Sequence, residues 1–147
     1  MSDFIIWGGN LQEYNGTEKN LVIPNRIDGI VVTSIGIGAF RGKELCSVVI
    51  PDTVRAIYDD AFSMNHLSSV TIPNSVEEIF DHAFENNQLT QVKLSKNIIT
   101  LGLGAFAGNR LSQVSIPMQV MQRGIEMQFQ LMQAFDAGVQ LDGRDAD

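Results

Sequence analysis

The dipeptide Ala-Phe recurs along this chain at a fixed interval. It occupies residues 39–40, 61–62, 83–84 and 105–106, with no slip in the spacing. A fixed period, here about 22 residues within a usual range of about 20 to 50, is typical of repeat proteins, whose units bury their apolar side chains only by stacking on one another. The period therefore predicts a solenoid, and no other feature of the sequence constrains the fold as strongly.

Further apolar positions keep the same period and define one unit. Each unit contains a short strand of the form Leu-x-x-Val-x-Ile-Pro, in which apolar and polar side chains alternate. Proline ends the strand because it has no N–H to donate. The apolar columns are Leu45, Leu67, Leu89 and Leu111; Val48, Val70, Val92 and Val114; Ile50, Ile72, Leu94 and Ile116; Val54, Val76, Ile98 and Val120; and Ile35, Ile57, Ile79 and Leu101.

A polar column accompanies the apolar ones. Asn65, Asn87 and Asn109 keep the period of the Ala-Phe dipeptide, whereas Lys43 occupies the equivalent position in the preceding unit. A buried asparagine at a corner of a solenoid can pair backbone groups that the turn leaves without partners. The alternative is a ladder of polar ligands, and we favour the structural interpretation because buried polar groups usually serve to pair others.

The N-terminal part differs from the regular units. In residues 4–16, two short apolar runs flank Gly8-Gly9-Asn10, which favours a β-hairpin that caps the core. Residues 20–44 form an atypical first unit, because the segment from Pro24 to Ala39 is longer than the equivalent segment from Pro51 to Ala61. An irregular first unit is what a solenoid needs to cover the open end of its core. The solenoid is thus expected over residues 1–117, with its regular repeats over residues 35–117.

The pattern is lost after Val120. Met121, Ile125, Phe129, Met132 and Phe135 recur at spacings of 4, 4, 3 and 3, which predicts an amphipathic helix over residues 118–138. Two interpretations remain open: the helix lies across the last repeat as a cap, or it forms an interface for a homodimer or another partner. Residues 139–147 form an acidic tail that we expect to be disordered.

Composition excludes some partners. The formal net charge of −7 disfavours nucleic acid and anionic membrane surfaces, both of which need a basic face. No apolar run approaches the length of about 18 residues that a membrane span requires, so no membrane insertion is expected. The chain starts without the basic and apolar regions of a signal peptide. Cys46 is the single cysteine, so an internal disulfide cannot form.

No set of residues predicts catalysis, a cofactor or a metal. The two histidines, His66 and His82, have no second histidine or cysteine at metal-ligand spacing. Asp59, Asp60 and Asp81 could form paired carboxylates, but turn positions favour aspartate for capping alone. We therefore expect no enzyme.

The outward positions of the strands are the best candidates for binding a protein partner. They are Ser47, Val49, Ser69, Thr71, Gln91, Lys93, Gln113 and Ser115, and we call them the grid. Solenoids use such extended faces to bind partners. The grid contains no aromatic or arginine anchor, although such residues usually dominate binding energy.

The repeat itself resembles a known family. Residues 67–79, LSSVTIPNSVEEI, followed by Ala83-Phe84, look like the BspA-like (Treponema-type) leucine-rich repeat, and the resemblance covers about residues 20–117. It implies a β-rich leucine-rich-repeat solenoid that is right-handed, with parallel strands, an N-terminal hairpin cap and a C-terminal helix. It also implies a bacterial protein-binding or cell-adhesion module without catalytic residues, at the cell surface or secreted if the chain is part of a longer exported protein. The alternative hypothesis is a structural spacer or a self-assembling unit that dimerises through residues 118–138.

Overall fold

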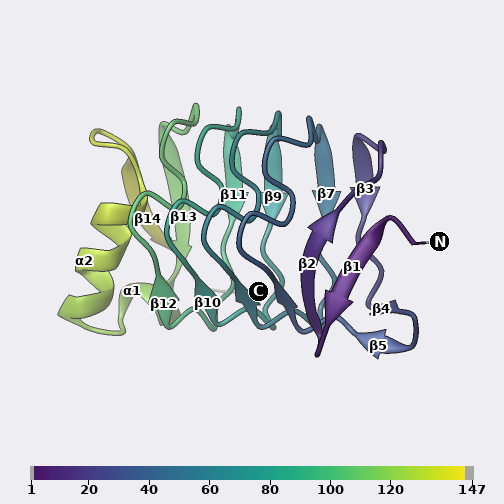
Figure 1. Cartoon of the computed structure of the whole chain (residues 1–147). Helices are drawn as coiled ribbons and strands as arrows, with labels where there is room; N and C mark the ends of the chain where they lie inside the picture. Colours follow the sequence, from purple (N-terminus) through teal and green to yellow (C-terminus); the bar gives the residue numbers. More distant parts are fainter. Residues whose placement is uncertain (1, 145–147) are drawn as a thin grey trace.

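A computed structural model describes residues 2–144 as a row of stacked coils, with the N-terminal hairpin at one end and helix α2 at the other (Figure 1). Each regular coil contributes one strand to each of two sides. The strands that contain the valine of the Leu-x-x-Val-x-Ile motif form one side. They are β3 (Asn20–Val22), β7 (Ser47–Val49), β9 (Ser69–Thr71), β11 (Gln91–Lys93) and β13 (Gln113–Pro117), followed by β14 (Gln140–Arg144).

The other side is a six-stranded sheet with the order β1-β2-β6-β8-β10-β12. Its strands from β2 onward pair in parallel, and β1 pairs antiparallel to β2. Their bounds are β1 (Phe4–Trp7), β2 (Asn10–Tyr14), β6 (Ser34–Ile35), β8 (Ala56–Ile57), β10 (Glu78–Ile79) and β12 (Thr100–Leu101). The segment expected to form a hairpin therefore continues this sheet through the pairing of β2 with β6.

The longer first unit contains a small hairpin of its own. Strands β4 (Arg26–Ile27) and β5 (Ile30–Val31) pair antiparallel on either side of Asp28-Gly29. Both turn residues have positive φ, 51° at Asp28 and 78° at Gly29, which is the conformation that a two-residue type I′ hairpin requires. The hairpin β4-β5 thus accounts for the extra length of this unit.

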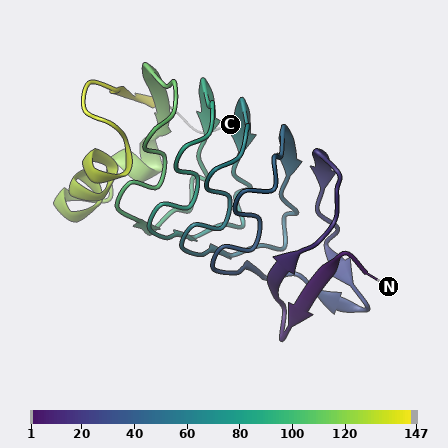
Figure 2. The ribbon, with the colours of Figure 1, turned by 45° about the horizontal axis from the view of Figure 1, so that its top comes forward.

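The phenylalanines form a stacked column through the core, one from each of the regular coils, and Figure 2 shows the backbone of these coils in a row. Phe40, Phe62, Phe84 and Phe106 are fully buried, with ring centroids 5.0 to 5.3 Å apart. Tyr14 continues the column at the N-terminal end, 5.3 Å from Phe40. Each ring is thereby packed between the rings of two neighbouring coils.

The asparagine column pairs backbone groups, as the sequence predicts. The Asn65 side-chain Oδ1 accepts from the N–H groups of Lys43 and Leu45, and its Nδ2 donates to the carbonyl oxygens of Phe40 and Phe62. Asn87 and Asn109 repeat this arrangement one and two coils later. The column therefore joins each coil to the one before it. Because these side-chain amides are already paired with backbone groups, the structural interpretation explains them better than a ladder of ligands does.

The coils do not stop at residue 117, which corrects the predicted boundary. A fifth Ala-Phe dipeptide, Ala134-Phe135, follows Ala105-Phe106 at a longer interval than the one that separates the first four. Phe135 stacks on Phe106 with ring centroids 5.2 Å apart, and Phe106 N–H donates to the Ala134 carbonyl oxygen as Phe84 N–H does to Ala105. Residues 118–144 thus form one more coil, in which a helix replaces the short strand of the six-stranded sheet.

The predicted helix over residues 118–138 is broken and shorter. It consists of α1 (Met118–Met121) and α2 (Ile125–Ala134), separated by residues 122–124, and the φ of Gly124 is 116°. Of the predicted apolar face, Ile125, Phe129 and Met132 are 70%, 57% and 70% exposed, so these three residues do not cover the last repeat. The buried residues of α2 are Met127, Leu131 and Ala134, which pack against the last coil.

The predicted disordered tail is wrong for residues 140–144, which form β14. This strand pairs in parallel with β13 along its whole length, from Gln113 opposite Gln140 to Pro117 opposite Arg144. Leu141 packs against the core, which explains why the acidic composition does not prevent folding. Residues 145–147 of the predicted tail lie outside the described residues.

Candidate binding surface

The structure brings the eight grid residues onto one exposed face, along β7, β9, β11 and β13 (Figure 1). The residues between them, Val48, Val70, Val92 and Val114, are buried. This alternation is the direct result of the two-residue period of a strand, which turns successive side chains to opposite faces. The grid is therefore displayed by a row of rigid strands rather than by loops.

The register of the strands aligns the grid residues across neighbouring coils. Strands β9 and β11 pair with Ser69 opposite Gln91 and Thr71 opposite Lys93. Two shallow depressions of about 350 and 370 Å³ lie on this face, over β9–β13 and over β7–β9 respectively. Neither depression is lined by an aromatic side chain, and together they extend across four strands, so this face suits a broad macromolecular contact.

The exposed face extends beyond the predicted grid at both ends. At the N-terminal end it includes Asn20, whose Oδ1 accepts a hydrogen bond of 2.9 Å from Ser47 Oγ, and the exposed Val22 beside Val49. At the other end it includes Gln140 and Asp142, and Asp142 accepts from the Gln113 amide. The first extension could have been found from Leu21-Val22-Ile23-Pro24, which repeats the strand motif, whereas β14 lacks that motif.

Polarity changes along this face. Val22 and Val49 form an apolar end, Lys93 carries the one charge among the eight grid residues, and Asp142 adds a carboxylate at the far end. Polar and neutral side chains occupy the space between them. A partner would thus meet an apolar patch, a cation and an anion in a fixed order.

Titratable residues elsewhere form ion pairs rather than a reactive cluster. The hydrogen bond between His82 and the Glu85 carboxylate raises the pKa of His82, and the charges of Asp60 and Asp81 act in the same direction. The hydrogen bond from Lys19, at 3.1 Å, lowers the pKa of the Glu44 carboxyl. The first pair lies within one turn, and the second joins neighbouring coils.

Residues 2–144 contain no group of three His, Cys, Asp or Glu side chains that could hold a metal ion. Cys46 is exposed, as a single thiol on the turn before β7. Within the same part of the chain, the helices are too short and too polar to cross a bilayer.

Comparison with known proteins identifies the repeat. The family model described as the BspA type leucine rich repeat region matches residues 14–127, with six copies. The crystal structure of a Treponema pallidum leucine-rich repeat protein is similar in fold, with a TM-score of 0.60 and 24% sequence identity. The similarity covers 76% of this chain and 64% of that one, so this chain spans less than two thirds of the other protein's length. No curated protein matches the chain.

Proposed function

Because the chain belongs to the BspA-type leucine-rich repeat family, we propose that it is a non-catalytic module that binds a protein partner through the extended grid face. Members of this family are generally protein-interaction or adhesion modules. The observation that carries the proposal is the row of exposed grid residues on consecutive strands, which form one continuous face. Because these residues lie on strands, binding a partner would not require loops to become ordered, which would cost conformational entropy.

A matched pair of variants tests the face. Thr71→Glu with Gln91→Glu adds two negative charges to the grid, and Gln122→Glu with Gln128→Glu adds the same charge to exposed positions near α2. Each immobilised protein is incubated with candidate extracellular proteins, and the bound fraction is quantified by mass spectrometry. The proposal expects a partner that binds the parent and the α2 variant but not the grid variant. Equal capture by both variants would show that the grid is not the binding face.

A second candidate function is self-assembly through α2. The observation that favours it is the stripe of Ile125, Phe129 and Met132, three large apolar side chains that are each more than half exposed on one short helix. Exposed apolar patches of this kind often mark contacts between proteins. Replacing all three by serine should convert a dimer into a monomer in light-scattering measurements over a range of concentrations. A parent protein that is already monomeric at high concentration would exclude this function.

We also infer that the coil is right-handed and that the hairpin β1-β2 acts as its N-terminal cap. Parallel strands joined by a crossover turn right-handed in about 98% of known cases. The cap is supported by Tyr14, which is buried against Phe40 and whose hydroxyl accepts a hydrogen bond of 2.9 Å from the Glu18 N–H. Removing residues 2–14 would expose Phe40, so the truncated chain should be less stable and more prone to associate. A truncated chain that melts at the parent's temperature would contradict the cap.

A further inference from the structure

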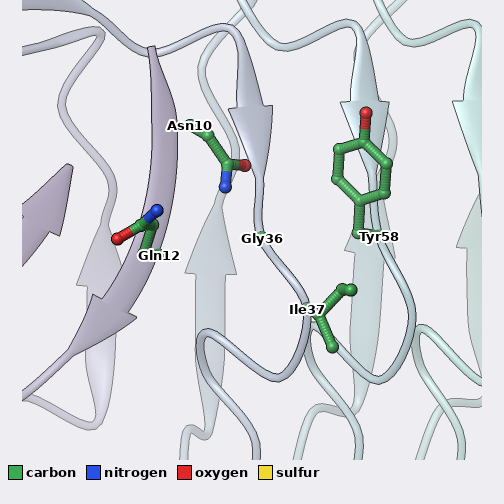
Figure 3. Close-up of a pocket in the computed structure, with 5 residues that line it drawn as sticks. All are labelled: Asn10, Gln12, Gly36, Ile37 and Tyr58. Carbon is green, nitrogen blue, oxygen red and sulfur yellow. The ribbon is translucent and has the colours of Figure 1, made fainter. Parts of the chain in front are cut away.

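A pocket of about 360 Å³ lies on the six-stranded sheet and shares no residue with the grid. It is lined by Asn10, Gln12, Gly36, Ile37 and Tyr58 (Figure 3). The depressions on the grid have similar volumes, so the residues that line this pocket, and not its size, distinguish it. The family repeat does not account for it, because Asn10 and Gln12 belong to the hairpin and not to a regular coil.

The pocket is a gap in a column of side chains. Register places Leu11 beside Ile35, Ile35 beside Ile57 and Ile57 beside Ile79. The residue that follows each of these positions therefore lies in one row, which reads Gln12, Gly36, Tyr58, Phe80 and, through the pairing of Ile79 with Leu101, Gly102. Tyr58 and Phe80 stack with centroids 5.1 Å apart and planes only 4° apart, whereas Gly36 has no side chain to cover the other face of Tyr58.

Gly36 leaves this space open because its backbone approaches β2 closely. Its N–H donates to the Leu11 carbonyl oxygen at 2.7 Å, and a Cβ atom on residue 36 would lie 2.9 Å from that same oxygen. A larger residue is therefore excluded, and backbone forms the floor of the pocket. Two strand spacings, about 9.5 Å in total, separate the backbones of Gln12 and Tyr58, which leaves room for one ring between them.

Two amide groups face this space across Gly36 from Tyr58 (Figure 3). The Asn10 Oδ1 accepts a hydrogen bond of 2.7 Å from Ser34 Oγ, which fixes the orientation of the amide. Its Nδ2 consequently lies over Gly36, 3.0 Å from where a Cβ would stand. Neither this nitrogen nor the Gln12 amide has a hydrogen-bond partner among the side chains and backbone of residues 2–144, so both can serve a ligand.

The chemistry of the lining selects the ligand. None of the five residues is charged, so a phosphate or carboxylate would find no cation in the pocket. A purely apolar ring would bury the two amides without hydrogen bonds, which costs free energy. A sugar ring meets both requirements, because its C–H face can stack on an aromatic ring while its hydroxyls pair with amide donors and acceptors at the edge.

We propose that this pocket binds a neutral pyranose ring of a carbohydrate, seated between Tyr58 and Gln12 above Gly36. The C–H face of the sugar packs on the uncovered face of Tyr58, and Asn10 Nδ2 and the Gln12 amide pair with its hydroxyls. Ile37, which is exposed beside Gly36, adds an apolar contact at the rim. Because the grid lies on other strands, this site functions independently of the protein-binding face.

The test is a titration of the ¹⁵N-labelled chain, followed by NMR, with the methyl glycosides of glucose, galactose, mannose and N-acetylglucosamine. At least one glycoside should cause saturable shifts in the side-chain amide signals of Asn10 and Gln12 and in the backbone signal of Gly36. Tyr58→Ala should weaken that binding by about tenfold or more, whereas Tyr58→Phe, which keeps the ring, should change it by less than about threefold. Leu103→Ala is the matched control, because Leu103 is exposed at the turn position three repeats after Ile37.

Three outcomes would overturn the proposal. One is the absence of shifts at these amides with every glycoside at about 50 mM, a concentration that detects affinities weaker than millimolar. Another is saturable binding that Tyr58→Ala leaves unchanged while the variant keeps the parent's dispersed amide spectrum. The third is tighter binding of adenosine or tyrosinamide than of any glycoside, which would assign the pocket to a planar aromatic ring instead.

Discussion

At the scale of single residues, the buried ring column concentrates the stability of the chain. Phe84 is fully buried between Phe62 and Phe106, at centroid distances of 5.1 and 5.3 Å. Phe84→Ala should therefore lower the free energy of unfolding by about 3–5 kcal/mol in urea denaturation. The matched control is Phe129→Ala on α2, where the ring is exposed and the loss should stay within about 0.5 kcal/mol. A loss below about 1 kcal/mol for Phe84→Ala would contradict the stacked core.

Asn87 illustrates how much one buried amide contributes. Its Oδ1 accepts from Leu67 N–H at 3.1 Å, and its Nδ2 donates to the carbonyl oxygens of Phe62 and Phe84. Asn87→Asp replaces that donor by an acceptor facing two carbonyl oxygens, so it should destabilise the chain by about 2–4 kcal/mol at neutral pH. Asn86→Asp, the same change on the exposed neighbouring residue, should cost little. Similar losses in both variants would show that the change in charge, and not the lost donor, determines stability.

The His82–Glu85 pair makes stability depend on pH. The Glu85 hydrogen bond raises the pKa of His82 in the folded chain, so the pair stabilises the fold fully below the unfolded pKa of about 6.5. This stabilisation is lost as the pH rises through the raised pKa of His82. The side chains are 41% and 31% exposed, so solvent screening keeps the effect below about 1 kcal/mol. Glu85→Gln should lower the pKa of His82 in an NMR titration, and an unchanged pKa would contradict the pairing.

At the scale of elements, α2 has two apolar stripes, and the structure buries only one of them. Leu131 is 2% exposed and contributes to the core, whereas Met132, the next residue, is 70% exposed. Leu131→Asp should therefore cost about 4 kcal/mol or more in thermal or urea unfolding, because it buries a charge without a partner. Met132→Asp should cost less than about 0.5 kcal/mol. The opposite ranking would mean that the stripe with Met132, and not the one with Leu131, packs against the last coil.

The regular coils could be predicted from the sequence because each column recurs with one residue type. The inward positions of Val70, Ile72 and Phe84 follow directly from the period and from strand alternation. The last coil could not be aligned, because α2 inserts extra residues and moves Ala134-Phe135 out of the register of the repeat. Periodicity also cannot choose between two apolar stripes on one helix, since the choice depends on what α2 contacts. Here the Gln130 Oε1 accepts from Leu101 N–H at the edge of β12, which turns Leu131 inward and leaves Met132 outside.

The two candidate surfaces, the grid and the pocket, also differ in how far the sequence could predict them. Alternation along the strands was enough to place the grid residues on one outward face. The pocket depends on the register between β2 and β6, which brings Gln12 next to Gly36 although the hairpin lies outside the repeat. No spacing in the sequence indicates that register. The available signal for a missing side chain was the column itself, in which Gly36 and Gly102 stand on either side of Tyr58 and Phe80.

At the scale of the whole molecule, each coil contacts only its neighbours, so the two ends have fewer stabilising contacts than the middle. The column of rings runs from Phe4 through Tyr14 to Phe135, and Phe4 is only partly buried. Hydrogen exchange should therefore be slowest at central amides such as those of Phe62 and Phe84, and faster in the N-terminal hairpin.

One substitution at the N-terminal end tests this gradient. Phe4→Ala removes the outermost ring of the column, so it should accelerate exchange within β1 and β2. Exchange at Phe62 and Phe84 should stay unchanged, because these amides bond to Ala83 and Ala105 and have no contact with the hairpin. The measurement is exchange followed by NMR in the parent and the variant under identical conditions. Equal acceleration at every amide would mean that the stack opens only as one cooperative unit, because the loss at one end would then be shared by all the coils.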